Sequence, residues 1–482
     1  MPNVAGILIA GTSSDAGKSL IAAGLCRVWA RQGVRVAPFK AQNMSNNSMV
    51  CPDGSEIGRA QYLQAIAAGV EPSSWHNPVL LKPGTDRRAH IVLRGQAAGT
   101  LEAGEYVGGR RALAAAAFDA YEELQARYDL IVTEGAGSPA EINLRRGDYV
   151  NFGLARRFGL PVVLVGDIDR GGVLASIYGH WAIVDDADRA SLAGYLINKF
   201  RGDQSVLDPG LKQLTARTGL RGFGVMPWLE HVWLDSEDAL AFAKWPRVPN
   251  TAGSLRVAAV RFPRISNATD LDALAAEPGL DVTATAHPSE ILAADLVVLP
   301  GSRSTVSDLA WLRRMGLADA LTQRARAGGP ILGICGGFQM LAASIEDQVE
   351  SGSGTVPGLG LLPTTVSFDA EKVLARPIGS WRGHQVEAYE IHHGRVLVQE
   401  AESFLDGVRQ GNTWGTIWHG AFENDGFRRA WLAEVAAAAG STWTPSPHSP
   451  GFAQRRTAML DQLAEALTEH VDTDALLELS RA

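Results

Sequence analysis

The sequence lacks the features that mark secreted and membrane proteins. No apolar run approaches the ~18 residues that a membrane-spanning helix needs, and no basic segment precedes an apolar one near the N-terminus. The 3 cysteines, Cys26, Cys51 and Cys335, have no CxxC spacing, which argues against a disulfide framework and against a zinc site. These absences predict a cytoplasmic protein without a membrane partner.

Basic excess, internal repeats and low-complexity tracts are also missing. The 44 Lys and Arg residues are outnumbered by 52 Asp and Glu residues, so the net charge is −8, and no basic block occurs. This argues against a nucleic-acid partner, whose binding protein should be basic. The composition, with 46% hydrophobic and 20% charged residues, is typical of globular proteins with sizeable cores. At roughly 150 residues per domain, the length predicts two to four domains.

A strand-to-helix turn surrounds one of the cysteines. The apolar run 330–334 leads into Cys335, and Gly336 and Gly337 precede a segment that begins well as a helix. Such an elbow exposes a nucleophile, and the positive end of the helix dipole favours its thiolate. The alternative is a small cysteine buried in a core. The flanking glycines and the abrupt change of pattern favour the nucleophile.

A phosphate loop follows the first strand. The apolar run 4–10 predicts a strand buried on both faces, and a helix is expected over 19–32. Between them lies the loop Gly11–Ser19, whose backbone N–H groups would cradle phosphates. Lys18 would bridge the outer phosphates, and Ser19 would hold Mg²⁺. The loop has one residue more than usual before its Gly-Lys pair, and a plain glycine-rich turn is the alternative. The candidate ATP-binding residues are Thr12, Asp15, Gly17, Lys18, Ser19 and Asn198.

Polar side chains follow the next strands, where parallel sheets bind their ligands. Strand 34–39 ends in the loop 40–48, whose amides and hydroxyls suit a polar substrate with several carboxylates; a solvated turn is the alternative. Strand 129–134 ends in Glu134, which is placed to bind Mg²⁺. Candidates also follow strand 161–166, although helix capping would explain them equally. The substrate candidates are Lys40, Gln42, Asn43, Asn46, Asp167 and Arg170.

Alternating strands and helices predict the fold class. Strand 193–198 ends in Asn198, which would hydrogen-bond an adenine edge, and strand 222–226 follows. This alternation predicts an α/β fold with a doubly wound parallel sheet. The pattern weakens over 229–254, and new strands begin at 255–260. The expected domains are 1–235, a phosphate-loop synthetase domain; 236–253, a linker; 254–445, a second α/β domain; and 446–482, a C-terminal helical extension.

A thiol nucleophile needs a nearby base, which is often distant in sequence. His419 ends a short β-like run and is followed by a glycine. His384 and the pair His392 and His393 compete with it. Chemistry alone does not choose among these histidines.

Two groups of motifs resemble known families. The Cys335 elbow with Gln339, the turn 300–302 and the segment 418–420 resemble triad-type glutamine amidotransferases. The phosphate loop and the Glu-Gly-Ala-Gly strand end resemble dethiobiotin synthetase-like enzymes. Joined in this order, they resemble the cobyric acid synthase family of cobalamin biosynthesis over nearly the whole chain. The most specific stretches are 38–48, 167–172, 198–203 and 389–394.

The resemblance implies that ATP and glutamine are used to amidate corrinoid side-chain carboxylates b, d, e and g of adenosylcobyrinic acid a,c-diamide. Cys335 would be the nucleophile and His419 its base. Backbone N–H groups near Gly301 and Gly336 would bind the oxyanion, and Gln339 would help to bind glutamine. Mg²⁺ would sit on Ser19 and Glu134 beside ATP.

One position departs from the amidotransferase pattern. Ala421 stands where the broader family has a triad glutamate two residues after the histidine, and Glu423 lies four residues on. The group that orients His419 is therefore unassigned. The related cobyrinic acid a,c-diamide synthases share the architecture but have a different loop after the second strand. They are the nearest alternative, followed by a non-enzymatic nucleotide switch. Homo-oligomerisation is left open.

Overall fold

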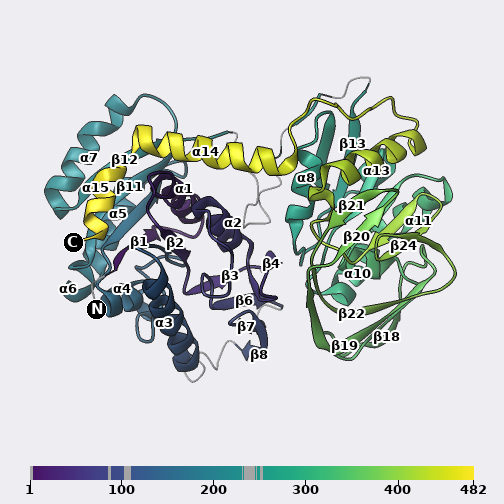
Figure 1. The fold of residues 1–482 in the computed structure, drawn as a ribbon, viewed down its shortest axis with the longest axis horizontal. Helices are drawn as coiled ribbons and strands as arrows, with labels where there is room; N and C mark the ends of the chain where they lie inside the picture. The colour runs from purple at the N-terminus through teal and green to yellow at the C-terminus, as the bar shows by residue number, and fades with distance from the viewer. Residues whose placement is uncertain are drawn as a thin grey trace. The chain divides into compact units, whose positions relative to one another are not determined.

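The chain forms two compact units, shown in Figure 1. The first unit consists of Met1–Ser45, Cys51–Val232 and Thr457–Ala482, and the second of Asn46–Val50 and Trp233–Arg456. Most of the expected extension 446–482 thus groups with the first unit, and the expected linker 236–253 lies largely outside the described residues. The computed structural model describes residues 4–84, 88–102, 110–230, 232, 245, 247–249 and 253–482.

A six-stranded parallel sheet is the centre of the first unit. Its strand order is β12-β11-β10-β1-β9-β2. The chain passes from β1 to the edge strand β2, returns to β9 between them, and then continues outward on the other side of β1 through β10, β11 and β12. The central strands are continuous apolar runs buried on both faces, as a parallel sheet covered by helices requires. The predicted doubly wound sheet is confirmed. Its strands are β1 (Ala5–Gly11), β2 (Val36–Phe39), β9 (Leu130–Glu134), β10 (Val162–Asp167), β11 (Leu192–Phe200) and β12 (Arg221–Pro227).

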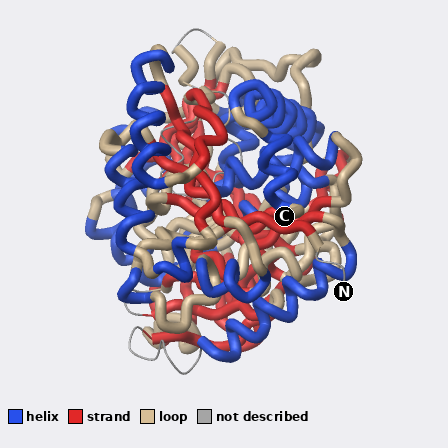
Figure 2. Tube along the Cα trace, turned by 90° about the vertical axis from the view of Figure 1, so that its left-hand side faces the viewer, coloured by secondary structure: helices blue, strands red, loops and turns tan. Residues whose placement is uncertain are grey.

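Helices connect these strands along the chain; Figure 2 draws helices in blue and strands in red. They are α1 (Lys18–Arg31), α2 (Arg59–Ala68), α3 (Arg110–Arg127), α4 (Phe152–Phe158), α5 (Val173–Ile183), α6 (Asp186–Arg189) and α7 (Gln204–Thr218). A smaller sheet, ordered β3-β6-β7-β8, lies between β2 and α3 in the chain and was not predicted. Its strands and the two short strands near it are β3 (Gln42–Met44), β4 (Ser48–Val50), β5 (Glu56–Gly58), β6 (Val79–Pro83), β7 (Arg88–Leu93) and β8 (Gln96–Glu102).

The second unit is built on a seven-stranded sheet of order β14-β13-β15-β16-β25-β24-β23. The strands from β14 to β25 are parallel, and β24 and β23 extend the edge in antiparallel fashion. This confirms the predicted second α/β domain. The strands are β13 (Leu255–Val260), β14 (Leu280–Thr285), β15 (Leu296–Leu299), β16 (Ile331–Ile334), β23 (Glu402–Phe404), β24 (Gly407–Gln410) and β25 (Thr413–Thr416).

A second sheet, ordered β18-β17-β19-β22, and the hairpin β20-β21 lie between β16 and β25 in the chain. They are β17 (Ser344–Asp347), β18 (Gly354–Pro357), β19 (Thr364–Ala375), β20 (Ile378–Trp381), β21 (His384–Glu387) and β22 (Glu390–Val398). The helices of this unit are α8 (Asp272–Ala275), α9 (Pro288–Ala293), α10 (Thr305–Arg314), α11 (Leu317–Arg326), α12 (Gly336–Leu341) and α13 (Asp425–Ala438).

The C-terminal tail forms the helices α14 (Phe452–His470) and α15 (Thr473–Ser480). The helix α15, yellow in Figure 1, lies beside β1 and β12 of the first unit. Gly24 in α1 leaves room for the tail, because a Cβ there would lie 2.2 Å from Leu467 Cδ1 and 3.0 Å from Leu463 Cγ. Among the described residues, no helix has the length and apolar character needed to span a membrane.

Replacing Gly24 by Ala should destabilise the protein by about 1–3 kcal/mol, because the new methyl group overpacks the contact between α1 and α14. Urea unfolding measures this change. Gly179→Ala is the matched control: Gly179 is exposed in the interior of α5, and no atom lies within 4 Å of a Cβ built there. Removing a helical glycine at that open position should stabilise by about 1 kcal/mol. Equal effects of the two variants would contradict the packing argument.

Candidate active sites

Cys335 stands at the turn between β16 and α12. Its backbone has φ 48° and ψ −109°, a left-handed conformation that residues other than glycine rarely adopt. A Cβ at Gly337 would lie 1.9 Å from the carbonyl oxygen of Leu299, so this turn requires glycine there. The N–H of Cys335 donates to the Thr416 carbonyl at 2.8 Å. The elbow is thereby fixed to β25, the strand that precedes His419.

His419 lies against Cys335 and is held by Asp270. The distance from Asp270 Oδ2 to His419 Nδ1 is 2.6 Å, and Asp270 Oδ1 accepts a hydrogen bond from the Gly420 N–H at 2.8 Å. Burial alone would lower the pKa of His419, but the charges of Asp270 and Cys335 and their hydrogen bonds raise it to about 10. An imidazolium beside a cysteine favours the thiolate. The three side chains therefore form a Cys–His–Asp cluster suited to nucleophilic attack.

The turn after β15 lies at the same cluster. A Cβ at Gly301 would be 3.1 Å from His419 Cε1, and a Cβ at Gly336 would be 2.7 Å from the Ser302 nitrogen. Backbone thus approaches Cys335 and His419 from two chain segments, an arrangement that could supply N–H donors to an oxyanion. Ser302 Oγ donates to Asp308 Oδ2 at 2.6 Å and fixes this turn. Burial raises the pKa of Asp308 to about 6 despite that hydrogen bond.

Gln339 is buried one helical turn beyond the elbow. Its Oε1 accepts a hydrogen bond from Thr305 Oγ1 at 3.1 Å. A Cβ at Gly394 would lie 2.6 Å from Gln339 Nε2, so the glycine provides space for the amide. The predicted glutamine-binding residue is therefore anchored between α10 and β22.

The phosphate loop connects β1 to α1. Gly17 has φ 97°, and a Cβ there would lie 2.1 Å from Asn198 Nδ2. Asn198 Nδ2 donates to the Ala16 carbonyl at 2.9 Å, so this predicted adenine-binding side chain supports the loop itself. The Thr12 N–H donates to the Val165 carbonyl at 3.0 Å, which ties the loop to β10.

Charged side chains of the loop are also engaged. Lys18 Nζ donates to the carbonyls of Ser13 and Ser14 at 2.8 and 3.0 Å. Asp15 pairs with Arg170 at 2.5 Å, and Lys199 pairs with Asp167 at 2.7 Å. The substrate candidates after β10 are thus linked by ion pairs to the phosphate loop and to β11.

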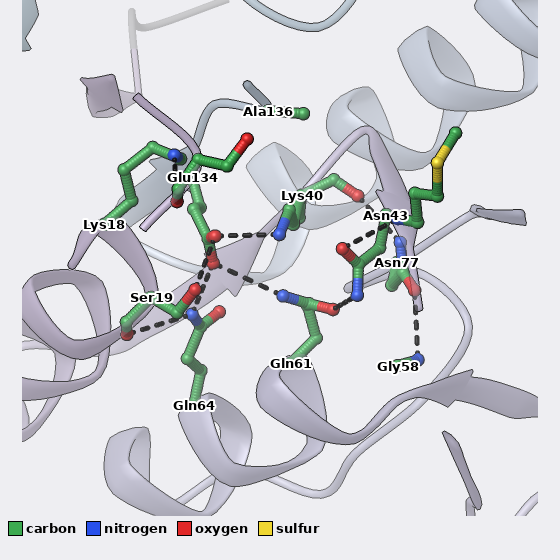
Figure 3. Close-up of polar contacts among 12 residues, drawn as sticks. Lys18, Ser19, Lys40, Asn43, Gly58, Gln61, Gln64, Asn77, Glu134 and Ala136 are labelled. Carbon is green, nitrogen blue, oxygen red and sulfur yellow. Dashed lines mark hydrogen bonds and ion pairs between the residues drawn. The ribbon is translucent and has the colours of Figure 1, made fainter. Parts of the chain in front are cut away.

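Glu134 is the centre of a hydrogen-bond network at the end of β9 (Figure 3). Its Oε1 accepts from Ser19 Oγ at 2.7 Å and from Lys40 Nζ at 2.8 Å. Its Oε2 accepts from Gln64 Nε2 at 2.7 Å and from Gln61 Nε2 at 3.3 Å. Burial would raise the pKa of Glu134, but Lys40 and the hydrogen bonds hold it below its ordinary value. Glu134 is therefore ionised at neutral pH.

The amide-rich loop extends this network. Asn43 Nδ2 donates to Gln61 Oε1 at 3.0 Å, as Figure 3 shows. The Tyr149 hydroxyl donates to Gln42. Asn46 groups with the second unit rather than with the other substrate candidates. Lys40 and Asn43 thus belong to the Glu134 network, directly and through Gln61, whereas Gln42 pairs with Tyr149.

Comparison with known proteins finds a family match for each part of the chain. Residues 7–240 match the CobQ/CobB/MinD/ParA nucleotide binding domain, and residues 256–427 match the CobB/CobQ-like glutamine amidotransferase domain. The cobyric acid synthase of Cutibacterium acnes is 62% identical over 482 residues, which cover 99% of this chain and 100% of that protein. This chain belongs to the cobyric acid synthase family. The enzymes of Streptomyces avermitilis and Mycolicibacterium gilvum are 55% and 53% identical, over 98% and 99% of this chain and 96% of each relative.

In this member of the family, the other candidate histidines are bound elsewhere. His392 lies at hydrogen-bond distance from the Gly394 carbonyl, 2.8 Å, and His393 from the Asp369 carbonyl, 3.0 Å. A Cβ at Gly426 would contact His384 at 3.0 Å, which places His384 near α13. Of these candidate histidines, His419 is therefore the one that the structure places beside Cys335.

Sequence reasoning missed Asp270. The residue lies 149 positions before His419 in a 3₁₀ turn, Ala268–Leu271, after β13. Ala421 offers no carboxylate, and Glu423 pairs with Arg456 at 2.8 Å. No sequence spacing could have indicated Asp270, because the contact forms between loops at the ends of two strands. Gln61 and Gln64, likewise, read as ordinary residues of an apolar helix.

Asp270→Asn should lower kcat/KM for glutamine by about a hundredfold or more, because the amide no longer stabilises the imidazolium. The pKa of His419 is raised, so the imidazolium form is fully present below its ordinary pKa of 6.5 and is lost as pH rises through about 10. The alkaline limb of glutaminase activity should therefore move to lower pH in this variant. Glu423→Gln is the control and should leave the profile unchanged. An unshifted alkaline limb in Asp270→Asn would count against the triad role.

Asp308→Asn should stabilise the protein more at pH 8 than at pH 5. The raised pKa means that the folded state favours the neutral carboxyl. The aspartate therefore loses stability as pH rises from its ordinary pKa of 3.8 through about 6, so the loss that the amide avoids is partial at pH 5 and complete at pH 8. The Asn side chain still accepts the hydrogen bond of Ser302. Urea unfolding of both proteins at the two pH values measures the difference. The exposed Glu346→Gln is the control, and a gain independent of pH would refute the explanation.

Proposed function

We propose that this chain uses ATP and glutamine to amidate carboxylates b, d, e and g of adenosylcobyrinic acid a,c-diamide, giving cobyric acid. The supporting observation is the coexistence of two sites in a chain that is 62% identical to a cobyric acid synthase. One is the Cys335–His419–Asp270 cluster, and the other is the phosphate loop with its ionised Glu134. Neither site alone explains why the other is present.

The second unit would release ammonia. The Cys335 thiolate attacks the amide carbon of glutamine, and backbone N–H groups near Gly301 and Gly336 stabilise the oxyanion. His419 gives its proton to the amide nitrogen, the C–N bond breaks and ammonia leaves. Water then hydrolyses the thioester to glutamate and restores the thiolate, with His419 accepting the proton. Asp270 keeps the imidazole oriented throughout.

The first unit would activate the carboxylate. A carboxylate resists attack by ammonia, so the γ-phosphoryl group of ATP is transferred to it, and ammonia displaces phosphate from the resulting acyl phosphate. Lys18 and the backbone of the phosphate loop bind the phosphates. Lys40 binds Glu134, and Asn43 is linked to it through Gln61. The ammonium and amide groups of Lys40, Gln42 and Asn43 suit a corrinoid carboxylate.

Mg²⁺ fits the oxygen pair of Ser19 Oγ and Glu134 Oε1, which lie 2.7 Å apart. Mg²⁺ is commonly bound by one or two protein oxygens together with substrate phosphates and water. The described residues contain no group of three or more His, Cys, Asp or Glu side chains that would hold a metal without a substrate. When bound, the ion would neutralise charge on the phosphates of ATP.

Cys335→Ala should abolish glutamine-dependent amidation but retain amidation with added ammonium, because ammonia bypasses the thiol. Mass spectrometry of cobyrinic acid a,c-diamide incubated with ATP should reveal four successive replacements of OH by NH₂. Cys26→Ala, at a buried cysteine outside the elbow, is the control and should use glutamine.

Loss of both activities in Cys335→Ala would contradict two sites joined by ammonia transfer. Wild-type protein that leaves the a,c-diamide unchanged would contradict the proposed substrate and favour another carboxylate. Glutaminase activity in the wild type would exclude a non-enzymatic nucleotide switch.

A further inference from the structure

A five-residue segment belongs to the second unit although its neighbours in the chain belong to the first. Asn46–Val50 groups with the second unit, whereas Ser45 and Cys51 group with the first. The segment directly follows the loop that carries three substrate candidates. The chain therefore links the acceptor loop of one unit covalently to the interior of the other.

One side of this segment contacts the turn that carries Asp270. Asn47 Oδ1 accepts a hydrogen bond from the Ala268 N–H at 3.2 Å. The Ser48 N–H donates to Asn267 Oδ1 at 3.0 Å. Asn47 and Asn267 are 5% and 3% exposed, so water does not readily replace these bonds. The two reciprocal bonds fix the start of the 3₁₀ turn three residues before Asp270.

The other side contacts the residue that stacks on His419. Val50 forms a small apolar cluster with Tyr389 and Ile391. The Tyr389 ring stacks on the His419 ring with centroids 5.3 Å apart and planes at 25°. The backbones of Tyr389 and His419 also exchange two hydrogen bonds of 3.0 Å. The segment thus touches both supports of the catalytic imidazole.

The preceding loop leads to the nucleotide site. Gln61 donates to Glu134 and accepts from Asn43, at 3.3 and 3.0 Å. Asn43 Oδ1 in turn accepts from the Met44 N–H at 2.9 Å. A ligand that engages Glu134 Oε2 or the Asn43 amide would compete with these bonds, which reach Met44, two residues before the segment begins.

We propose that Asn47 is a positioning residue for glutamine hydrolysis, which holds the Asp270 turn and makes hydrolysis respond to occupancy of the ATP and acceptor site. This inference rests on the proposed function. A catalytic histidine tolerates only small displacements from its productive geometry, so a shift of the Asp270 turn is sufficient to alter the rate.

The test compares Asn47→Ala, which removes the acceptor oxygen, with Asn47→Asp, which retains one. Asn412→Ala is the matched control, because it removes a side-chain hydrogen bond of 2.7 Å to the Gly328 carbonyl elsewhere in the second unit. Glutaminase kcat and KM are measured with and without ATP and cobyrinic acid a,c-diamide, and amidation is measured with ammonium. The rate at which iodoacetamide alkylates Cys335, followed by peptide mass spectrometry, measures the reactivity of this thiol in the absence of corrinoid.

ATP and corrinoid should stimulate the wild-type glutaminase. Asn47→Ala should lose that stimulation, with kcat lowered about tenfold, the factor that one hydrogen bond represents, and KM for glutamine unchanged. Its Cys335 should be alkylated more slowly, and its ammonium-dependent amidation should remain within about twofold of the wild type. Asn47→Asp and Asn412→Ala should behave as the wild type.

The inference would be overturned if ATP and corrinoid did not stimulate the wild-type glutaminase. It would also be overturned if they still stimulated the glutaminase of Asn47→Ala. A parallel loss of ammonium-dependent amidation in Asn47→Ala would also overturn it, because the role would then be structural. Failure of the proposed function can be told apart from failure of this inference, because the wild type would then not amidate the corrinoid even with ammonium. In that case the alkylation rates still decide whether Asn47 positions the cluster.

Discussion

The pairing of Asp270 with His419 is the interaction on which the second active-site cluster depends. The two side chains are 3% and 1% exposed, and an isolated charge on either would be costly at that depth. Asp270 binds the imidazole through one oxygen and the Gly420 N–H through the other. Because Gly420 follows His419 directly, a single carboxylate fixes both the ring and the backbone that carries it. The histidine has little freedom to turn away from Cys335.

Glu134 is also a buried carboxylate, but its partners suit a different task. Its donors are divided between the two oxygens: Ser19 and Lys40 bind Oε1, and the amides of Gln61 and Gln64 bind Oε2. A cation that approached Oε1 would compete with the Lys40 ammonium, whereas the amides would still hold Oε2. The carboxylate can therefore change one partner without becoming unpaired. Asp270 has one side-chain or backbone donor on each oxygen, His419 on Oδ2 and the Gly420 N–H on Oδ1, so the loss of either donor would leave that oxygen without its bond.

The sequence was informative wherever one local pattern determined the structure. Continuous apolar runs identified β1, β9 and β10, and glycines around Cys335 identified the elbow, because each follows from sterics and burial within a few residues. β14 was not among the predicted strands: Leu280–Thr285 has the alternating pattern of a half-buried strand, whereas the other strands were recognised as continuous apolar runs. Asp270 and Gln61 were missed for another reason. Their roles arise from contacts with residues far away in sequence, and neither has a neighbourhood that distinguishes it from an ordinary turn or helix.

The exchange of segments explains why the two units are parts of one chain. The tail beyond Thr457 packs Leu463 and Leu467 against α1, both fully or almost fully buried, and so completes the first unit. Asn46–Val50 contributes Val50, which is fully buried, to the second unit. A cut anywhere between the two catalytic sequences would still leave each unit dependent on a segment encoded with the other. Burying such segments favours joint folding, since removing either would expose apolar surface and unmade hydrogen bonds. The covalent connection is thus part of the packing of both units, beyond its role as a tether.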